Sequence, residues 1–429
     1  MRHYFTFILL IVVSFVGLVA CNTGAAIEPD AVTTATIAAG TIDAPAATAG
    51  PAPTTTPATP TAAAEATTAP TMIPAATATA APTVLCPEVP RPALVLTTGP
   101  GFELHNPLTG ERCPLSLPEG IGYLQTAGER LYFTLFDHAA GYTTVARVGP
   151  DGVVEPLDAT RAEGAIHYNA RFAVAADESQ MAWTRMSAQD DPNATAFLGS
   201  LWVGNPDGGE PVTILEDAPG GELRILDPIR FSSDSTTLFF SWEPIGLGGM
   251  WASFNGRSDN LYRVPVTGGE PEKIFDCADM ELFLCIGDFL DDGTVTYIDA
   301  ERSIHVVGLG GVEMAAIPTA GDYAGYPTFT PTDELIYSEA VVPTDVDTPL
   351  PAPGTIYRVA APYTGAPTVV ATANGLLASY MDRPFLDDDT LVVAYQEGEM
   401  WGSALLNMAG DITPLEPWPN AYLAAVWPE

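Results

Sequence analysis

The chain has 429 residues, and 53 acidic side chains against 16 basic ones give it a formal net charge of −37 at pH 7. Such an acidic surface repels phosphate backbones, so nucleic acid is not an expected partner. With 47% hydrophobic and only 16% charged residues, the chain holds enough apolar material for a large globular core.

Residues 1–20 form a predicted export signal. Arg2 precedes an apolar run of 16 residues, 5–20, whereas a membrane span needs about 20. The run ends in Leu18-Val19-Ala20-Cys21, which resembles the lipobox of bacterial lipoproteins. The resemblance implies cleavage before Cys21 and lipid on its thiol, hence a cell-envelope protein anchored on the extracytoplasmic side of a bacterial membrane. An uncleaved signal anchor is the alternative, and it also tethers the domain to the membrane.

Residues 21–85 are predicted to be a disordered linker. Between Asn22 and Leu85, 48 of 64 residues are Ala, Thr or Pro, and this stretch has no aromatic residue, Lys or Arg. Such a composition offers nothing to build a core. In polyproline II geometry this tether could span roughly 200 Å.

Residues 86–429 carry one hairpin motif seven times. Its clearest copy, LYRVPVTGGEPEKIF, has two alternating strands joined at Gly268 and Gly269. The other copies turn at Gly110, Gly152, Gly208, Gly310, Gly365 and Gly410. A second hairpin, whose later strand holds Trp183, Phe240 or Tyr337 at an expected core position, precedes the motif. Each unit therefore predicts a four-stranded antiparallel sheet, and this repeat spacing is typical of propeller blades.

The two ends of this region predict how the ring closes. The first unit lacks an innermost strand, whereas the last residues, YLAAVWPE, read as an innermost strand with no unit after it. We expect the C-terminal strand to complete the first blade, because this removes two exposed sheet edges. The predicted fold is all-β: a seven-bladed β-propeller of four-stranded antiparallel blades over residues 86–429.

The segments LYRVPVTGGEP, LWVGNPDGGEP and FSSDSTTLFFS resemble the TolB-type, WD-repeat-like β-propeller family. The resemblance covers residues 86–429 and implies contact with a protein, a peptide or a saccharide. Domains of this type also gate peptidases. TolB itself resembles a six-bladed ring with a separate N-terminal domain, whereas this sequence has seven units and a disordered tether.

Four cysteines follow Cys21, and an even number in an exported chain favours disulfides. The predicted pairs are Cys86–Cys113, where the tether meets the last strand of the first blade, and Cys277–Cys285, within one connection. Loop closure stabilises the fold by about 3.5 kcal/mol for the first pair and about 2.5 kcal/mol for the second. Free buried thiols are the alternative. Neither CxxC spacing nor a nearby histidine points to a metal, and no cofactor is expected.

The strands of each blade are named A to D from the axis outward, and the connections between them predict two unlike faces. The A–B and C–D turns are short. The B–C and D–A connections are expected to be long and to share one face, where binding residues are usual. The expected loops are 158–169, 187–199, 243–260, 341–354 and 371–382. Runs such as Asp291-Asp292 and Asp387-Asp388-Asp389 fit A–B turn chemistry, with calcium binding as the alternative.

The fourth unit's long loop, EPIGLGGMWASFNGRSDN, is the best candidate for a binding site. Trp251 and Phe254 lie there among glycines together with Arg257 and Asp259, and aromatic residues are enriched at binding sites. The alternative is that Trp251 only caps the centre of the ring. Other side chains expected on this face are Tyr168, Asp190, Asp191, Tyr326 and Arg383.

The sequence contains no nucleophile elbow, HExxH or glycine-rich phosphate loop. It favours a lipid-anchored, monomeric binding or scaffold module for a protein or glycan partner, without chemistry of its own. The alternative is a carbohydrate-active hydrolase or lyase that uses loop-face carboxylates such as Asp190 and Asp259. Two acids roughly 5 to 9.5 Å apart beside an aromatic ring would favour that alternative.

Overall fold

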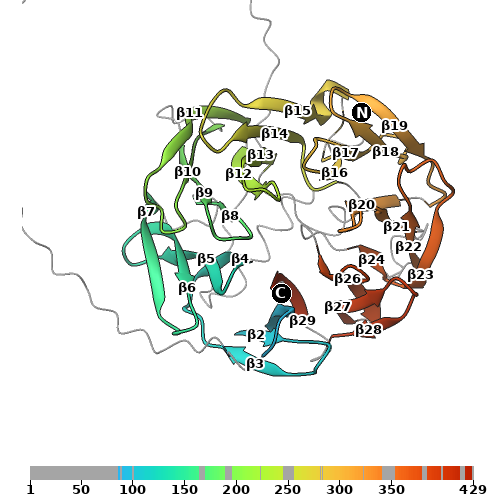
Figure 1. The fold of residues 1–429 in the computed structure, drawn as a ribbon, viewed down its shortest axis with the longest axis horizontal. Coiled ribbons are helices and arrows are strands. Elements are labelled where there is room, and N and C mark those ends of the chain that lie inside the picture. The colour runs from blue at the N-terminus through green and yellow to red at the C-terminus, as the bar shows by residue number, and fades with distance from the viewer. Residues whose placement is uncertain are drawn as a thin grey trace, which may run out of the picture. The chain divides into compact units, whose positions relative to one another are not determined.

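The computed structural model describes residues 86, 89–98, 101–163, 170–188, 196–222, 224–244, 256–280, 282, 284–321, 323–340, 353–378, 384–397, 400–415 and 421–427. Their strands form seven antiparallel sheets that stand as blades around one axis (Figure 1). This confirms the predicted all-β, seven-bladed propeller. Residues 1–85, with the predicted export signal, Cys21 and linker, lie outside the described residues.

The first three blades each contain four strands, ordered from the axis outward. Blade one consists of β29 (Ala421–Trp427), β1 (Ala93–Thr98), β2 (Gly101–His105) and β3 (Arg112–Leu115). Blade two consists of β4 (Ile121–Ala127), β5 (Arg130–Asp137), β6 (Tyr142–Val148) and β7 (Val154–Glu163). Blade three consists of β8 (Phe172–Val174), β9 (Met181–Ala188), β10 (Ala196–Gly204) and β11 (Val212–Glu222).

The remaining blades follow the same order, except that the innermost strand of blade seven is split in two. Blade four consists of β12 (Arg224–Phe231), β13 (Thr237–Pro244), β14 (Asn260–Pro265) and β15 (Glu272–Asp276). Blade five consists of β16 (Ile286–Phe289), β17 (Val295–Ile298), β18 (Ile304–Gly308) and β19 (Val312–Ile317). Blade six consists of β20 (Tyr323–Phe329), β21 (Leu335–Ala340), β22 (Pro353–Val359) and β23 (Thr368–Asn374). Blade seven consists of β24 (Leu377–Ala378), β25 (Phe385–Asp387), β26 (Thr390–Glu397), β27 (Met400–Asn407) and β28 (Ile412–Pro414).

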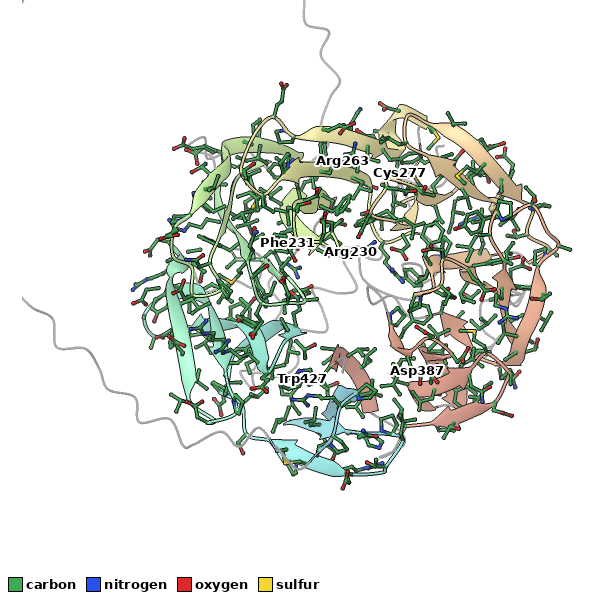
Figure 2. All side chains as sticks on the ribbon, in the orientation of Figure 1. Arg230, Phe231, Arg263, Cys277, Asp387 and Trp427 are labelled. Carbon is green, nitrogen blue, oxygen red and sulfur yellow. A yellow bond between two sulfur atoms is a disulfide. The ribbon has the colours of Figure 1, made fainter. Side chains whose placement is uncertain are left out.

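The C-terminal strand closes the ring, as the sequence predicts. Strand β29 pairs antiparallel with β1 in blade one. Trp427 at its end is fully buried, and its indole Nε1 donates to the Gly128 carbonyl of blade two at 2.8 Å. The Arg91 guanidinium lies 3.3 Å from the centre of the Trp427 ring, and Trp427 is labelled in Figure 2. The last strand is therefore fixed both within its own blade and against the next one.

Aromatic pairs recur between strands B and C of the middle blades. Trp183 stacks on Trp202 in blade three, Phe240 on Tyr262 in blade four and Tyr337 on Tyr357 in blade six, with ring centroids 6.4, 5.3 and 5.2 Å apart. In each pair the two residues lie directly opposite one another. Trp183, Phe240 and Tyr337 are at most 1% exposed, which confirms their predicted place in the core.

A buried ion pair links three neighbouring blades near the axis. Arg230 of β12 contacts Asp288 of β16 at 3.2 Å, and both side chains are buried (Figure 2). The second Asp288 oxygen accepts the Phe329 amide of β20 at 2.8 Å. Because the charges have each other and further hydrogen-bond partners, they can remain ionised inside the fold.

The acidic A–B turns follow ordinary turn chemistry. Asp177, Asp234, Asp292 and Asp387 each accept the backbone amide two residues further along, at 2.8 to 3.1 Å. Some of these turns also bond to the next blade, since the Ser235 hydroxyl donates to Asp177 at 3.1 Å. The carboxylates therefore shape the turns and join blades.

Both predicted disulfides are present. Cys86 is bonded to Cys113 in β3, with Cα atoms 5.9 Å apart, and Cys277 to Cys285, with Cα atoms 5.8 Å apart. The first fixes the start of the described chain to the outer strand of blade one. The second closes the D–A connection between blades four and five, which also contains the short helix η3 (Cys277–Met280).

The expectation of long B–C and D–A connections is wrong at several places. Strand β7 continues to Glu163, within the predicted loop 158–169, and a single residue separates β11 from β12. The polar and glycine-rich sequence there resembles a loop. However, the backbone continues the ladder, for example by pairing Ala196 with Glu222, and such neighbours decide strand formation more than local preference does.

Replacing Trp427 with Ala tests the closure. The change removes a fully buried ring and its hydrogen bond to blade two, so we expect a loss of about 3 to 5 kcal/mol in the free energy of unfolding. Thermal and denaturant unfolding of residues 86–429 measure it. Val369→Ala, at a side chain that is 60% exposed, is the control and should change stability by less than about 0.5 kcal/mol. A Trp427→Ala domain as stable as the control would contradict the closure.

Candidate functional site

The B–C and D–A connections define the loop face of the ring, and the A–B and C–D turns define its turn face. On the loop face, the described end of the blade-four B–C loop lies along the inner strand of blade five. Ser258 bridges to Ile286, and the Arg257 amide donates to the same Ile286 carbonyl at 2.5 Å. A Cβ atom at Gly256 would collide with that carbonyl oxygen, so only glycine fits. Arg257 then reaches blade six, where it donates to the Thr328 hydroxyl at 2.6 Å.

Asp259 anchors this loop end. One carboxylate oxygen lies 2.5 Å from Arg224 Nη2, and the other accepts the Leu284 amide. The Asp259 backbone carbonyl accepts the Cys277 amide at 2.7 Å. With its side chain 4% exposed and both oxygens bonded, Asp259 joins the loop to the disulfide-closed connection and has a structural role.

Two further carboxyl groups lie close together on the loop-face half of blade four. In the register of β12 and β13, Asp227 is opposite Ser241, and Glu243 follows two residues along on the same side of the sheet. The Ser241 hydroxyl donates to Glu243. Burial, and then the charge of Asp227, raise the pKa of Glu243 to about 8. Burial also raises the pKa of Asp227. Glu243 therefore carries its proton at neutral pH.

Arg171 of the neighbouring blade provides the balancing positive charge. It lies immediately before β8, and its charge acts to lower the pKa values of Asp227 and Glu243. Its guanidinium lies 5.5 Å from the centre of the Tyr123 ring of blade two. The buried Nε of Arg171 has no hydrogen-bond partner within the described part of the chain. A guanidinium, two carboxyls and an aromatic ring from three consecutive blades therefore come together.

A small hollow lies further round the loop face, between blades four and five. Its volume is about 140 Å³, and it is lined by Leu282, Leu284, Cys285, Ile298, Asp299, Ala300 and Arg302. Pockets for small organic ligands are usually about 300 to 1,000 Å³. The hollow therefore fits one side chain or one sugar substituent of a larger partner.

The structure places three of the nine predicted ligand contacts. Arg257 and Asp259 lie at the loop end, as described above, and Tyr326 lies in β20, 5.9 Å from the Arg257 guanidinium and only 5% exposed. Asp259 and Tyr326 therefore contribute mainly packing and internal bonds. The other six lie outside the described residues: Tyr168, Asp190, Asp191, Trp251, Phe254 and Arg383.

Sequence reasoning missed Arg171, Asp227 and Glu243. Each lies in or beside a predicted core strand, and the sequence separations of 56 and 16 residues hide their proximity. Charged side chains inside strands that otherwise hold apolar residues were the available signal, since charge in a core needs a partner or a role.

The fold resembles several known propellers at low sequence identity. A prolyl endopeptidase structure aligns with a TM-score of 0.49 and 11% identity, over 77% of this chain and 50% of that one. A putative TolB from Agrobacterium tumefaciens aligns with a TM-score of 0.39 and 12% identity, over 78% and 93%. The periplasmic gluconolactonase of Pseudomonas aeruginosa gives 0.41 and 11%, over 77% and 97%. This chain spans about half the length of the prolyl endopeptidase, and these likenesses concern the β-propeller fold alone.

No protein-family model matches the sequence, and no curated protein matches it. Within the described ranges, no group of three or more His, Cys, Asp or Glu side chains is arranged to hold a metal ion. The same part of the chain has no helix long and apolar enough to cross a membrane.

The raised pKa of Glu243 predicts how stability depends on pH. Its ordinary pKa of 4.5 rises to about 8 in the folded protein, so the folded state holds a proton that the unfolded state releases between these values. The stabilisation is therefore complete below pH 4.5 and is lost as the pH rises to about 8.

Replacing Glu243 with Gln should weaken the pH dependence of the free energy of unfolding. We expect the stability lost between about pH 5 and pH 9 to be smaller by more than about 1 kcal/mol. Urea unfolding at a series of pH values measures the slope. Glu301→Gln, at an exposed turn of blade five on the same face, is the matched control. Identical slopes for wild type and Glu243→Gln would show that Glu243 titrates normally in the folded protein.

Proposed function

We propose that this protein is a binding module whose loop face recognises a protein or glycan partner, and that lipid on Cys21 anchors it outside a bacterial membrane. The observation that carries the proposal is the cluster of Arg171, Asp227, Glu243 and Tyr123, which come from blades two, three and four. Arg171 has an unsatisfied buried donor there, beside the protonated Glu243 and the Tyr123 ring. A buried donor without a partner costs free energy, which a ligand acceptor would recover.

The chemistry of this group suits hydroxyl-rich or amide-rich ligands. The guanidinium and the protonated carboxyl donate hydrogen bonds, Asp227 accepts them, and Tyr123 offers a partly exposed ring for stacking. The hollow between blades four and five is small, which favours a large ligand that lies across the face. A saccharide chain or an extended peptide has this shape.

A second candidate is a carbohydrate-active hydrolase or lyase. Asp259 is engaged in internal bonds, so it does not supply the chemistry of such an enzyme. Instead, Glu243 and Asp227 form the carboxyl pair. The pKa of about 8 makes Glu243 a proton donor at neutral pH, which is the property a general acid needs.

A glycan array and a pull-down from cell-envelope extract, both with residues 86–429, test the proposal. We expect retained ligands, and Arg171→Ala should weaken their binding by about tenfold or more. The matched control is Arg263→Ala, because Arg263 pairs with Glu272 on the outer part of blade four (Figure 2). Arg263→Ala should bind like the wild type.

Mass spectrometry of the bound glycans separates the two candidates. Intact ligands favour the binding module. Cleaved or unsaturated products that disappear with Glu243→Gln favour the enzyme. Retention of the same ligands by Arg171→Ala and by wild type, with equal affinity, would mean that this part of the loop face is not the binding site.

A further inference from the structure

The exposed apolar side chains are concentrated on the turn face, opposite the proposed binding site. Among the described residues, eight large hydrophobic side chains are exposed, and seven of these lie in a C–D turn or within three residues of one. These seven form what we call the aliphatic rim: Leu108, Val153, Val212, Leu309, Val312, Met314 and Val369. The eighth, Met280, lies in the D–A connection on the opposite face.

The rim is distinct from the inner part of the same face. The A–B turns, which lie nearer the axis, contain none of these exposed apolar side chains and instead carry acids. The acids there are Glu129, Asp177, Glu178, Asp234, Asp291, Asp292, Asp333, Glu334, Asp388 and Asp389. Because the outermost strands form the circumference of the ring (Figure 1), the C–D tips of blades one, two, three, five and six surround this acidic centre. Single exposed hydrophobic residues are common, but seven of the eight among the described residues lie in or beside C–D turns, and none lies in an A–B turn.

The chain preceding the ring arrives at this same rim. Cys86 is bonded to Cys113, the second residue of β3, just after the C–D turn that carries Leu108. Asn106 in that turn also donates to the Pro90 carbonyl at 3.0 Å. The described chain therefore begins, at Cys86, on the turn face of blade one, and Cys21 lies 65 residues before that point in the sequence.

We propose that the aliphatic rim docks the ring on a lipid surface of zwitterionic headgroups. This inference rests on the proposed anchor at Cys21, because that anchor brings a membrane to the turn face. Each rim side chain contributes little, but a tethered domain meets the surface at high effective concentration, so weak contacts suffice. Docking in this way presents the loop face, with Arg171 and Glu243, away from the membrane.

The charge of the rim selects the headgroup. The C–D turns also carry the acids Glu111, Asp151, Asp207, Glu210, Glu270 and Asp411. The region from residue 86 onward keeps 49 of the 53 acids and 15 of the 16 bases, a formal charge of −34. Anionic lipids repel this surface, whereas phosphatidylethanolamine and phosphatidylcholine carry no net charge and do not.

The test uses residues 86–429, since every described strand, including the closing β29, lies within them. An N-terminal histidine tag attaches the domain to vesicles of phosphatidylethanolamine and phosphatidylcholine that contain a nickel-chelating lipid, so lipid on Cys21 is not needed. A polarity-sensitive fluorophore is placed on Leu309→Cys at the rim or on Ala300→Cys, an exposed position on the loop face of the same blade. We expect vesicles to increase the emission at least twofold, with a blue shift, at position 309 and to leave position 300 unchanged.

Substitutions in the aliphatic rim test whether the fluorescence change at position 309 depends on it. Val153→Ser together with Val312→Ser and Met314→Gln should remove most of the change at position 309, while Met280→Gln, on the opposite face, should retain it. Melting temperatures confirm that all variants fold. Replacing the zwitterionic lipid with phosphatidylglycerol should reduce the change severalfold.

Four results would overturn the proposal: no vesicle-dependent change at position 309, equal changes at both positions, a change only with anionic vesicles, or a change without vesicles that grows with protein concentration. The last would mean that a second copy covers the rim. The anchor is tested separately, because Cys21→Ala in the full chain should abolish lipid attachment in cells. The loop-face ligand is tested by the glycan array. Each claim can therefore fail alone.

Discussion

The pairing of β29 with β1 is the contact on which the ring depends. Every other blade is made of strands that follow one another along the chain, so its sheet can form from local hairpins. Blade one instead joins residues from the two ends of the described chain, Leu94 with Val426. Without this pairing, β1 would present an open edge at the axis, and blades one and two would lose the Trp427 contact.

The ionisable side chains inside the blades fall into two groups. Arg230 with Asp288 joins blade four to blade five, whereas Arg224 with Asp259 lies within blade four, and in both pairs the charged groups are within hydrogen-bond distance. Arg171, Asp227 and Glu243 are less fully compensated, since one guanidinium nitrogen lacks a partner and both carboxyls have raised pKa values. Locally unfavourable electrostatics of this kind are expected where a protein binds something.

Repeats and topology allowed most of the fold to be predicted. Seven similar hairpins, a first unit without an inner strand and a spare strand at the C-terminus led to the closed ring, and the same topology selected Cys86–Cys113 and Cys277–Cys285. Strand ends were predicted less well, as at Glu163, because the neighbouring ladder outweighed the local sequence.

Most of the candidate site could not be predicted from the sequence. Asp259 lies in a loop whose composition is typical of a binding site. Only the fold shows that Arg224 and the Leu284 amide occupy its carboxylate oxygens. Asp227 and Glu243 come together through the register of β12 on β13. A one-residue change in that register would turn one of them to the other side of the sheet, and no local pattern fixes it.

Hydrogen exchange of the C-terminal strand tests the closed ring most directly. Peptides covering 421–427 are followed by mass spectrometry in residues 86–429, together with peptides of β1 as the paired reference. Closure predicts that both strands exchange slowly and at similar rates, through the same cooperative opening, because each supplies the hydrogen bonds of the other. Rapid exchange of 421–427 while β1 and the remaining inner strands stay protected would contradict closure of the ring by β29.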